Sequence, residues 1–505
     1  MVGVPKSNRC DFCRWRKTKC DEAWPTCGSC RKAGKECSGP SKRVKFVHGG
    51  RHTRRDNHEV GQAEKNAVTS LTDKGLDTST NTNWLNLKNK TTINGSTFSK
   101  IRIWSQKQRI PNKLSGTQAD LLAGNLINHL NSSEGTGYSL TVFLSTLRYV
   151  PPLLESSEAL YDATNLLVST WLHLCRGANS HDVLSLVSYN RALRSLQRAL
   201  NDPQKQTSSA TLAATIYLQI VEHLFDYSKG IDQIPHCNGI YAIMMKRGAP
   251  KPGDDIGCQL ILDSFGFIFK LLIRGDTDNF FTRPDWENAL VSFFAQYKTR
   301  TPILVEISKI IHQPTVLADV IRRFAKIRNI PEHLQDLQAL EALSIALNDV
   351  GENFRALDRK TVQPLLQNKT IYEEDDPESP FSTSYMFPNG VTALHFTNVA
   401  SINIVINTLR QELNAILDIN DPSLEAECLE WSGRIWRSCR YTLSLKPLCS
   451  ASFSRHICIS YMFAGPPERA YLLGVLEETD SYRQQSVRRW TESAVFSQCN
   501  SLLGR

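Results

Sequence analysis

Six cysteines near the amino terminus constrain this chain more than any other feature. They are Cys10, Cys13, Cys20, Cys27, Cys30 and Cys37, and their spacing is C-x2-C-x6-C-x6-C-x2-C-x6-C. The pattern is an internal repeat with an offset of 17 residues, and both halves read C-x2-C-R-x5-C. A C-x2-C pair can place two thiolates at neighbouring corners of one tetrahedral zinc ion. The spacing therefore indicates a metal-binding module.

The number of cysteines limits how many zinc ions the module can bind. Two separate tetrahedral zinc sites need eight ligands, but the repeat has six cysteines and the nearest histidine, His48, lies outside it. One zinc ion would leave two thiols idle, whereas two zinc ions that share two bridging thiolates use every cysteine. A module of about 35 residues buries too little apolar surface to fold alone, so metal binding must stabilise it. We expect two zinc ions per chain, with Phe12 and Trp15 packed on the cluster.

Positive charge is concentrated in the same region. Residues 1–60 hold 15 Lys and Arg against 6 Asp and Glu, while the remainder holds 44 of each kind. Such asymmetry is typical of a nucleic-acid-binding module, although a basic tail that aids solubility has the same signature. The cysteines favour the nucleic-acid interpretation. No apolar signal segment begins the chain, so metal binding is favoured over disulfides.

The segment CDFCRWRKTKCDEAWPTCGSCRKAGKEC resembles the fungal binuclear zinc-cluster family of transcription factors. Besides the cysteines, the basic run 14–19, Asp21 after the third cysteine and the loop proline Pro25, often cis in the family, match its pattern. The resemblance implies that Cys10 and Cys27 bridge the two zinc ions. It further implies that Cys13 and Cys20 complete one site and that Cys30 and Cys37 complete the other.

The basic residues of the first half are the candidate DNA readers. Arg14, Arg16, Lys17 and Lys19 are expected within one short helix of about two turns, whereas the basic residues of the second half are diluted by Gly34 and Glu36. The resemblance implies that Lys17 reaches guanine edges of a CGG triplet. The other three residues would hold phosphates. A solvated basic face is the alternative for this run, and a DNA contact is the alternative for Trp15.

The rest of the chain divides by composition. Residues 1–45 form the cysteine module, and the polar segment 46–115 has too little apolar surface to offset the entropy of ordering, so we expect a disordered linker. Residues 116–505 read as a large all-α domain. The expected fold class is thus a small zinc-stapled two-helix cluster, a disordered linker and a large helical domain.

Apolar periodicity places the helices of the large domain. The clearest are 182–201, 207–227 and one that starts at Pro331 and runs through Leu347; others are expected near 258–273, 302–327, 391–417, 422–442 and 482–500. The apolar run 260–273 contains Asp263 and Lys270, so it reads as a buried helix rather than a membrane span. The acidic segment 373–378 reads as a solvated loop, with an activation segment as the alternative.

Residues 217–250 resemble part of the fungal-specific regulatory domain that often follows such clusters. His236-x-x-Gly239, an Ile/Met stripe and Arg247-Gly248 carry the resemblance, which implies a helical regulatory domain. We interpret His236 as a helix-start residue and Met244-Met245 as core.

Together with these patterns, the resemblance implies a nuclear transcription factor that binds zinc and double-stranded DNA and regulates genes of RNA polymerase II. The transcriptional machinery is a further candidate partner, and no membrane partner is expected. Residues 41–80 show no heptad repeat, so homodimerisation is in doubt. One rival is a zinc-stapled protein-interaction module. A metalloenzyme is disfavoured because closed all-thiolate sites leave no open coordination position, and no enzyme motif is complete.

Overall fold

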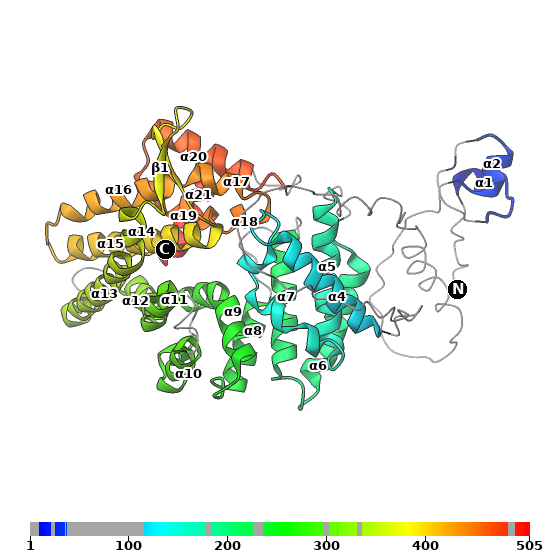
Figure 1. Ribbon diagram of the computed structural model, residues 1–505, viewed down its shortest axis with the longest axis horizontal. Coiled ribbons are helices and arrows are strands. Elements are labelled where there is room, and N and C mark those ends of the chain that lie inside the picture. The colour runs from blue at the N-terminus through cyan, green and yellow to red at the C-terminus, as the bar shows by residue number, and fades with distance from the viewer. Residues whose placement is uncertain are drawn as a thin grey trace, which may run out of the picture. The chain divides into compact units, whose positions relative to one another are not determined.

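A computed structural model describes the protein, and the chain divides into two units, residues 1–108 and 109–505. The described residues are 10–21, 26–35, 37, 116–177, 183–225, 236–275, 277–295, 302–310, 312–330, 336–482 and 490–505. The expected linker, 46–115, lies outside them. In the small unit, two one-turn helices, α1 (Asp11–Trp15) and α2 (Gly28–Lys32), pack against each other (Figure 1).

The large unit begins with a group of helices in which α5, α6, α8 and α9 pack around α7. Their bounds are α4 (Gln118–Ser133), α5 (Glu158–Cys175), α6 (Leu186–Asn201), α7 (Ser209–Phe225), α8 (Cys237–Arg247) and α9 (Asp255–Arg274). Short 3₁₀ turns, Leu140–Val142, Ser145–Tyr149 and Pro151–Leu153, connect α4 to α5. Nearly every residue of α7 is buried, because α5, α6, α8 and α9 pack against it (Figure 1). A helix that is apolar on most sides is stable only when it is enclosed in this way.

The middle and last parts of the large unit continue the helical packing. After a 3₁₀ turn at Phe280–Thr282, the elements are α10 (Pro284–Ala295), α11 (Pro302–Lys309), α12 (Gln313–Arg328), α13 (Leu337–Leu357), a π-helical turn (Asp358–Val362) and α14 (Gln363–Gln367). A hairpin of β1 (Tyr372–Asp375) and β2 (Thr383–Met386) precedes α15 (Gly390–Ile416), α16 (Ser423–Trp436), α17 (Cys439–Ser444), α18 (Leu448–Ala451), α19 (Ser454–Ser460), a 3₁₀ turn (Tyr461–Phe463), α20 (Pro466–Thr479) and α21 (Glu492–Leu502). The expected all-α class is confirmed, and the hairpin is the one sheet among the described residues.

Helix α9 explains the most apolar run of the sequence. By length and composition this helix could cross a membrane, but a core helix passes the same test. It packs against α7, α8 and α12, and Leu260, Ile268 and Leu272 are buried. Its Asp263 carboxylate accepts hydrogen bonds from the backbone and hydroxyls of Ser145 and Thr146 at 2.5–3.0 Å. A partly buried carboxylate held by four donors is typical of a helix packed within a folded domain.

Several expected helices differ from the observed ones at their ends. The helix expected from Pro331 begins at Leu337, where the Asp336 side chain accepts from the backbone N–H groups of Gln338 and Ala339. The helix expected over 302–327 is two helices, because Pro314 lies in the first turn of α12, where its missing N–H costs nothing. The helix expected over 482–500 is described as α21, from Glu492, and 483–489 lie outside the described residues.

The acidic segment 373–378 is part of a hairpin rather than a free loop. Glu373 and its neighbours in β1 pair with β2 in antiparallel register, with Glu373 opposite Tyr385. Glu373 forms an ion pair with Arg437 at 2.8 Å, and the backbone N–H of Tyr385 donates to the Arg437 carbonyl at 2.7 Å. The expectation of a loop was therefore wrong for residues 373–375, although the strand remains exposed to solvent.

His395 gives the large unit a testable dependence on pH. Its Nε2 lies 2.8 Å from the Thr361 hydroxyl, and burial lowers the pKa of its imidazole from 6.5 to about 4. Between these two values the unfolded chain binds a proton that the folded chain does not. The stability that comes from the neutral ring is therefore complete above pH 6.5 and is lost as the pH falls toward 4. We expect this group to lower the free energy of unfolding by about 2 kcal/mol between pH 6.5 and 5.

Denaturant unfolding of the wild type and His395→Gln at pH 7 and pH 5 measures this contribution. Glutamine can keep a hydrogen bond to Thr361 but does not titrate, so the variant should lose less stability on acidification. An equal loss in both proteins would contradict the assignment to His395.

Candidate metal centre and nucleic-acid interface

The two one-turn helices of the small unit hold the cysteines in equivalent places. Cys10 immediately precedes α1, and Cys13 lies within it; Cys27 and Cys30 have the same relation to α2. The Cys27 sulfur accepts a hydrogen bond from the Cys30 backbone N–H at 3.4 Å, so it also caps α2. These four cysteines are buried, and Cys20 and Cys37 are partly buried beside them. The sequence repeat is thus a structural repeat.

The six sulfurs form two groups of four that share two members. Cys10, Cys13, Cys20 and Cys27 make one group, Cys10, Cys27, Cys30 and Cys37 make the other, and the sulfurs within each group lie within 4.8 Å of one another. The Cys10 sulfur lies 3.7 Å from that of Cys27, 3.7 Å from that of Cys30 and 3.9 Å from that of Cys20. A tetrahedral zinc site with Zn–S bonds of about 2.3 Å has edges of about 3.8 Å. Each group therefore has the dimensions of a tetrathiolate zinc site.

Burial of the thiols fits a cationic occupant. Burial raises the pKa of the Cys10 thiol to about 12, and it also raises the pKa of Cys30. Without a cation these side chains would stay protonated at neutral pH. Zinc supplies the positive charge that favours thiolates and binds as their protons leave. The residues present therefore fit two zinc ions.

Asp21 and Ser29 connect the two halves of the cluster. The Asp21 carboxylate accepts from the backbone N–H of Gly28 at 2.9 and 3.0 Å, and the Ser29 hydroxyl donates to the Lys19 carbonyl at 3.3 Å. A side chain at residue 28 would bring its Cβ within 2.7 Å of the Asp21 carboxylate. A larger residue at position 28 would therefore force the Asp21 carboxylate to shift, whereas glycine permits this close approach, which satisfies a free donor at the start of α2.

Lys17 has a backbone conformation that its side chain does not favour. Helix α1 ends when the Thr18 N–H donates to the Cys13 carbonyl at 3.0 Å, and α2 ends when the Lys35 N–H donates to the Cys30 carbonyl at 3.1 Å. Both ends are left-handed caps with positive φ, 54° at Lys17 and 59° at the equivalent Gly34. Glycine is the residue expected there, and lysine costs roughly 1 kcal/mol more. An alignment of the two sequence repeats would have revealed that lysine stands at position 17 where the second repeat has glycine at position 34.

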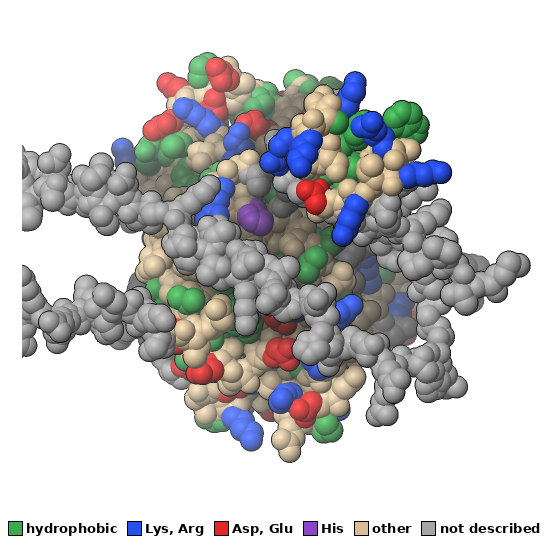
Figure 2. All heavy atoms as spheres, turned by 90° about the vertical axis from the view of Figure 1, so that its right-hand side faces the viewer, with side chains coloured by type: hydrophobic (Ala, Val, Ile, Leu, Met, Phe, Trp, Pro, Cys, Tyr) green, Lys and Arg blue, Asp and Glu red, His purple; other side chains and the backbone are tan. Residues whose placement is uncertain are grey.

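The basic residues lie differently from the expected two-turn helix. Helix α1 ends at Trp15, and Arg16, Lys17 and Lys19 follow in the turn that returns the chain to Cys20. These three side chains are exposed, as are Arg31, Lys32 and Lys35 in the second half; the Arg14 side chain lies outside the described part. The helix is short because Cys20 must return to the cluster. Figure 2 shows Lys and Arg side chains gathered on the module, with a hydrophobic side chain exposed among them.

The two aromatic residues of α1 have different surroundings. Phe12 packs against the buried cysteines, and the Arg16 guanidinium lies 5.7 Å from the centre of its ring. Trp15 is 80% exposed. The expectation that both residues cover the cluster is confirmed for Phe12 and wrong for Trp15. Phe12 and Cys13 occupy the inward side of α1, so a residue two positions after Cys13 faces away from it. Pro25 lies outside the described residues.

In the large unit, His236 and the adjacent methionines have structural roles. His236 immediately precedes α8, and its Nε2 lies 3.0 Å from the buried carboxylate of Glu222 on α7. Met244 is buried, and Met245 packs at the edge of the core. The interpretation of His236 as a helix-start residue and of the methionines as core agrees with this geometry.

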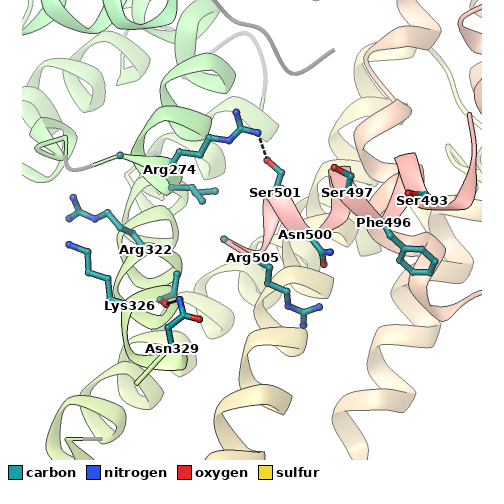
Figure 3. A pocket seen from close by; sticks show the side chains of 14 residues that line it. Arg274, Arg322, Lys326, Asn329, Ser493, Phe496, Ser497, Asn500, Ser501 and Arg505 are labelled. Atoms are coloured by element: carbon teal, nitrogen blue, oxygen red, sulfur yellow. Dashed lines mark hydrogen bonds between the residues drawn. The ribbon is translucent and has the colours of Figure 1, made fainter. Parts of the chain in front are cut away.

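A polar cavity of about 820 Å³ lies beside α9, α12 and α21 (Figure 3). Four cationic side chains line it: Arg274, Arg322, Lys326 and Arg505. Arg322 pairs with Asp319 and Arg505 with Glu412, while Arg274 donates to the Ser501 hydroxyl at 3.0 Å. Arg274 and Lys326 also lie in the last turns of α9 and α12, where cations offset the helix dipoles. Internal pairing and helix ends therefore account for most of this charge.

Comparison with known families gives one match, to a segment of the small unit. The model of the family described as "Fungal Zn(2)-Cys(6) binuclear cluster domain" matches residues 9–45. No curated protein and no solved structure matches the chain. Domains of this family bind two zinc ions and occur in DNA-binding transcription factors. The two overlapping cysteine groups agree with that metal content.

Proposed function

From the premise that residues 9–45 are a fungal Zn(2)-Cys(6) binuclear cluster domain, we propose that this chain is a sequence-specific transcription factor that reads CGG-type triplets and regulates genes transcribed by RNA polymerase II. The observation that most supports sequence reading is Lys17. It occupies a left-handed cap where the equivalent residue of the repeat is glycine. A strained residue persists when its side chain is useful, and an outlier of this kind is a reason to infer function.

The six cysteines are the proposed zinc ligands. Cys10 and Cys27 bridge the two ions because each belongs to both groups of four. Cys13 and Cys20 complete one ion, and Cys30 and Cys37 complete the other. The two ions hold α1 against α2 and fix the turn that carries the basic residues. A reader that is held rigidly by metal is suited to base recognition.

The basic residues then divide by role. Lys17 donates from its ammonium to O6 and N7 of guanine in the major groove, and Arg14, Arg16 and Lys19 hold phosphates. The Lys19 carbonyl accepts from Ser29, so the second half of the cluster holds the backbone of this residue in place. Two zinc ions and six thiolates carry a net charge of about −2, which the surrounding Lys and Arg outweigh.

Duplex binding over a salt series tests the proposal. The full-length protein should bind a duplex with a CGG triplet more tightly than a scrambled duplex of equal length. The logarithm of affinity should fall linearly with the logarithm of salt concentration, by about one unit of slope for each phosphate contact. Equal affinity for both duplexes would refute sequence-specific recognition. A failure to bind either one would favour the alternative, a zinc-stapled protein-interaction module.

An enzymatic role receives no support from the cluster. Four thiolates close each tetrahedral site, so no coordination position is left for a substrate or an activated water. We therefore assign the cluster a structural role in DNA recognition.

The remaining parts of the chain have proposed roles that follow from this function. Residues 116–505 would regulate activity, as the resemblance of 217–250 implies. The protein would act in the nucleus, directed there by Lys42-Arg43-x-Lys45 and Arg51-x-x-Arg54-Arg55, which lie outside the described residues. Since 41–80 carry no heptad repeat, the module would bind a single triplet as a monomer unless the large domain dimerises.

A further inference from the structure

Trp15 is the most exposed large hydrophobic side chain among the described residues. It ends α1, and its indole is not packed on the buried cysteines among the described residues of the module, where Phe12 occupies the inward side. Trp15 is 80% exposed, so its large apolar ring stays in contact with water, which is unfavourable. Trp is also among the residues that contribute most when an interface buries them. The position therefore indicates a surface that is covered in a complex.

The positive charge beside Trp15 indicates what kind of partner would cover its indole. The residues that follow Trp15, namely Arg16, Lys17 and Lys19, are exposed and cationic. A partner that reaches the indole must also face these cations, so it has to be strongly anionic. Duplex DNA meets this requirement and offers apolar surface beside its phosphates, namely the C5-methyl group of thymine and the faces of the deoxyribose rings. An ordinary protein partner offers no comparable density of negative charge.

We propose that Trp15 is a further DNA contact, which packs its indole ring on apolar DNA surface next to the CGG triplet. This inference rests on the proposed function. Lys17 contacts the triplet from the cap of α1, so the ring two residues earlier, on the outer side of the same helix, reaches the flanking nucleotide. The indole N–H, which can only donate, faces a phosphate oxygen. Trp15 thereby adds affinity that depends on the nucleotide beside the triplet or on the sugar there.

The test compares Trp15→Ala and Trp15→Phe in the full-length protein. Zinc content is measured first, and both variants should retain two ions because the exposed ring covers no ligand. Trp15→Ala should bind the CGG duplex about 5- to 30-fold more weakly than the wild type, and Trp15→Phe should lose less, since it keeps an aromatic ring. The matched control is Tyr372→Ala, which removes an exposed aromatic side chain from the hairpin of the large unit and should leave affinity unchanged.

A second arm identifies the apolar group. Uracil in place of each flanking thymine removes the C5-methyl group and nothing else. If the methyl group is the contact, this replacement weakens the wild type and leaves Trp15→Ala unaffected. If deoxyribose is the contact, the replacement affects neither protein, and Trp15→Ala still binds more weakly than the wild type.

Two results would overturn the inference. The first is a Trp15→Ala variant that binds the CGG duplex as tightly as the wild type, which would mean that the ring faces another partner. The second is a variant that loses zinc, which would mean that the ring supports the cluster. Failure of the proposed function is recognised separately, because the wild type itself would then show no preference for CGG over scrambled DNA.

Discussion

Replacing Cys27 with serine should remove both zinc ions from the small unit, because its sulfur belongs to both groups of four. Cys37→Ser removes a member of one group and should leave about one ion bound. Structural zinc contributes apparent binding free energies of about 10–16 kcal/mol in small zinc modules, far more than the residual core could supply. Loss of both ions should therefore unfold the module and abolish DNA binding.

Elemental analysis of purified full-length proteins, followed by duplex binding, measures these effects. The matched control is Cys175→Ser, which changes an exposed cysteine in the large unit and should retain two ions. A wild type with one zinc ion would refute the shared-thiolate arrangement. So would a Cys27→Ser variant that keeps one ion as firmly as Cys37→Ser does.

Replacing Lys17 should reduce affinity for a CGG duplex about 10- to 100-fold while affinity for scrambled DNA barely changes. The left-handed cap makes Lys17→Gly the most informative substitution. It removes the proposed base contact and also relieves strain, so the module should hold zinc at least as well as the wild type. Loss of CGG preference in a stabilised module cannot be attributed to misfolding.

Two controls separate base reading from charge and strain. Lys19→Ala should weaken binding to both duplexes similarly and lower the salt slope by about one unit. Gly34→Ala places a side chain in the equivalent cap of α2, where φ is 59°. It should destabilise the module by about 1 kcal/mol and leave the CGG preference intact. If Lys17→Gly retains full preference for CGG, this lysine does not read the base.

The sequence alone predicted the features that depend on local spacing. The six cysteines imply two zinc ions because the count of tetrahedral ligands admits few solutions. The helices of the large unit follow from apolar periodicity, which locates α6, α7, α9 and α15 to within a few residues. Their ends are less well predicted, because caps such as Asp336 compete with other start signals such as Pro331.

Contacts between distant residues decided what the sequence could not. The helix expected over 422–442 is interrupted at residues 437–438, where the Arg437 carbonyl accepts from the N–H of Tyr385 in β2. The same arginine pairs with Glu373, and this ion pair helps to hold an acidic segment as a strand. No local pattern encodes a partner more than 50 residues away. In the small unit, the chain must likewise turn back so that Cys20 reaches the other cysteines, and α1 therefore ends after Trp15. Lys17 adopts the left-handed conformation at this turn, and the Trp15 indole is left exposed to solvent. Sequence spacing therefore determined the metal centre and the positions of the helices. The return of the chain to the cysteine cluster decided which side chains of the turn after α1 are exposed to solvent.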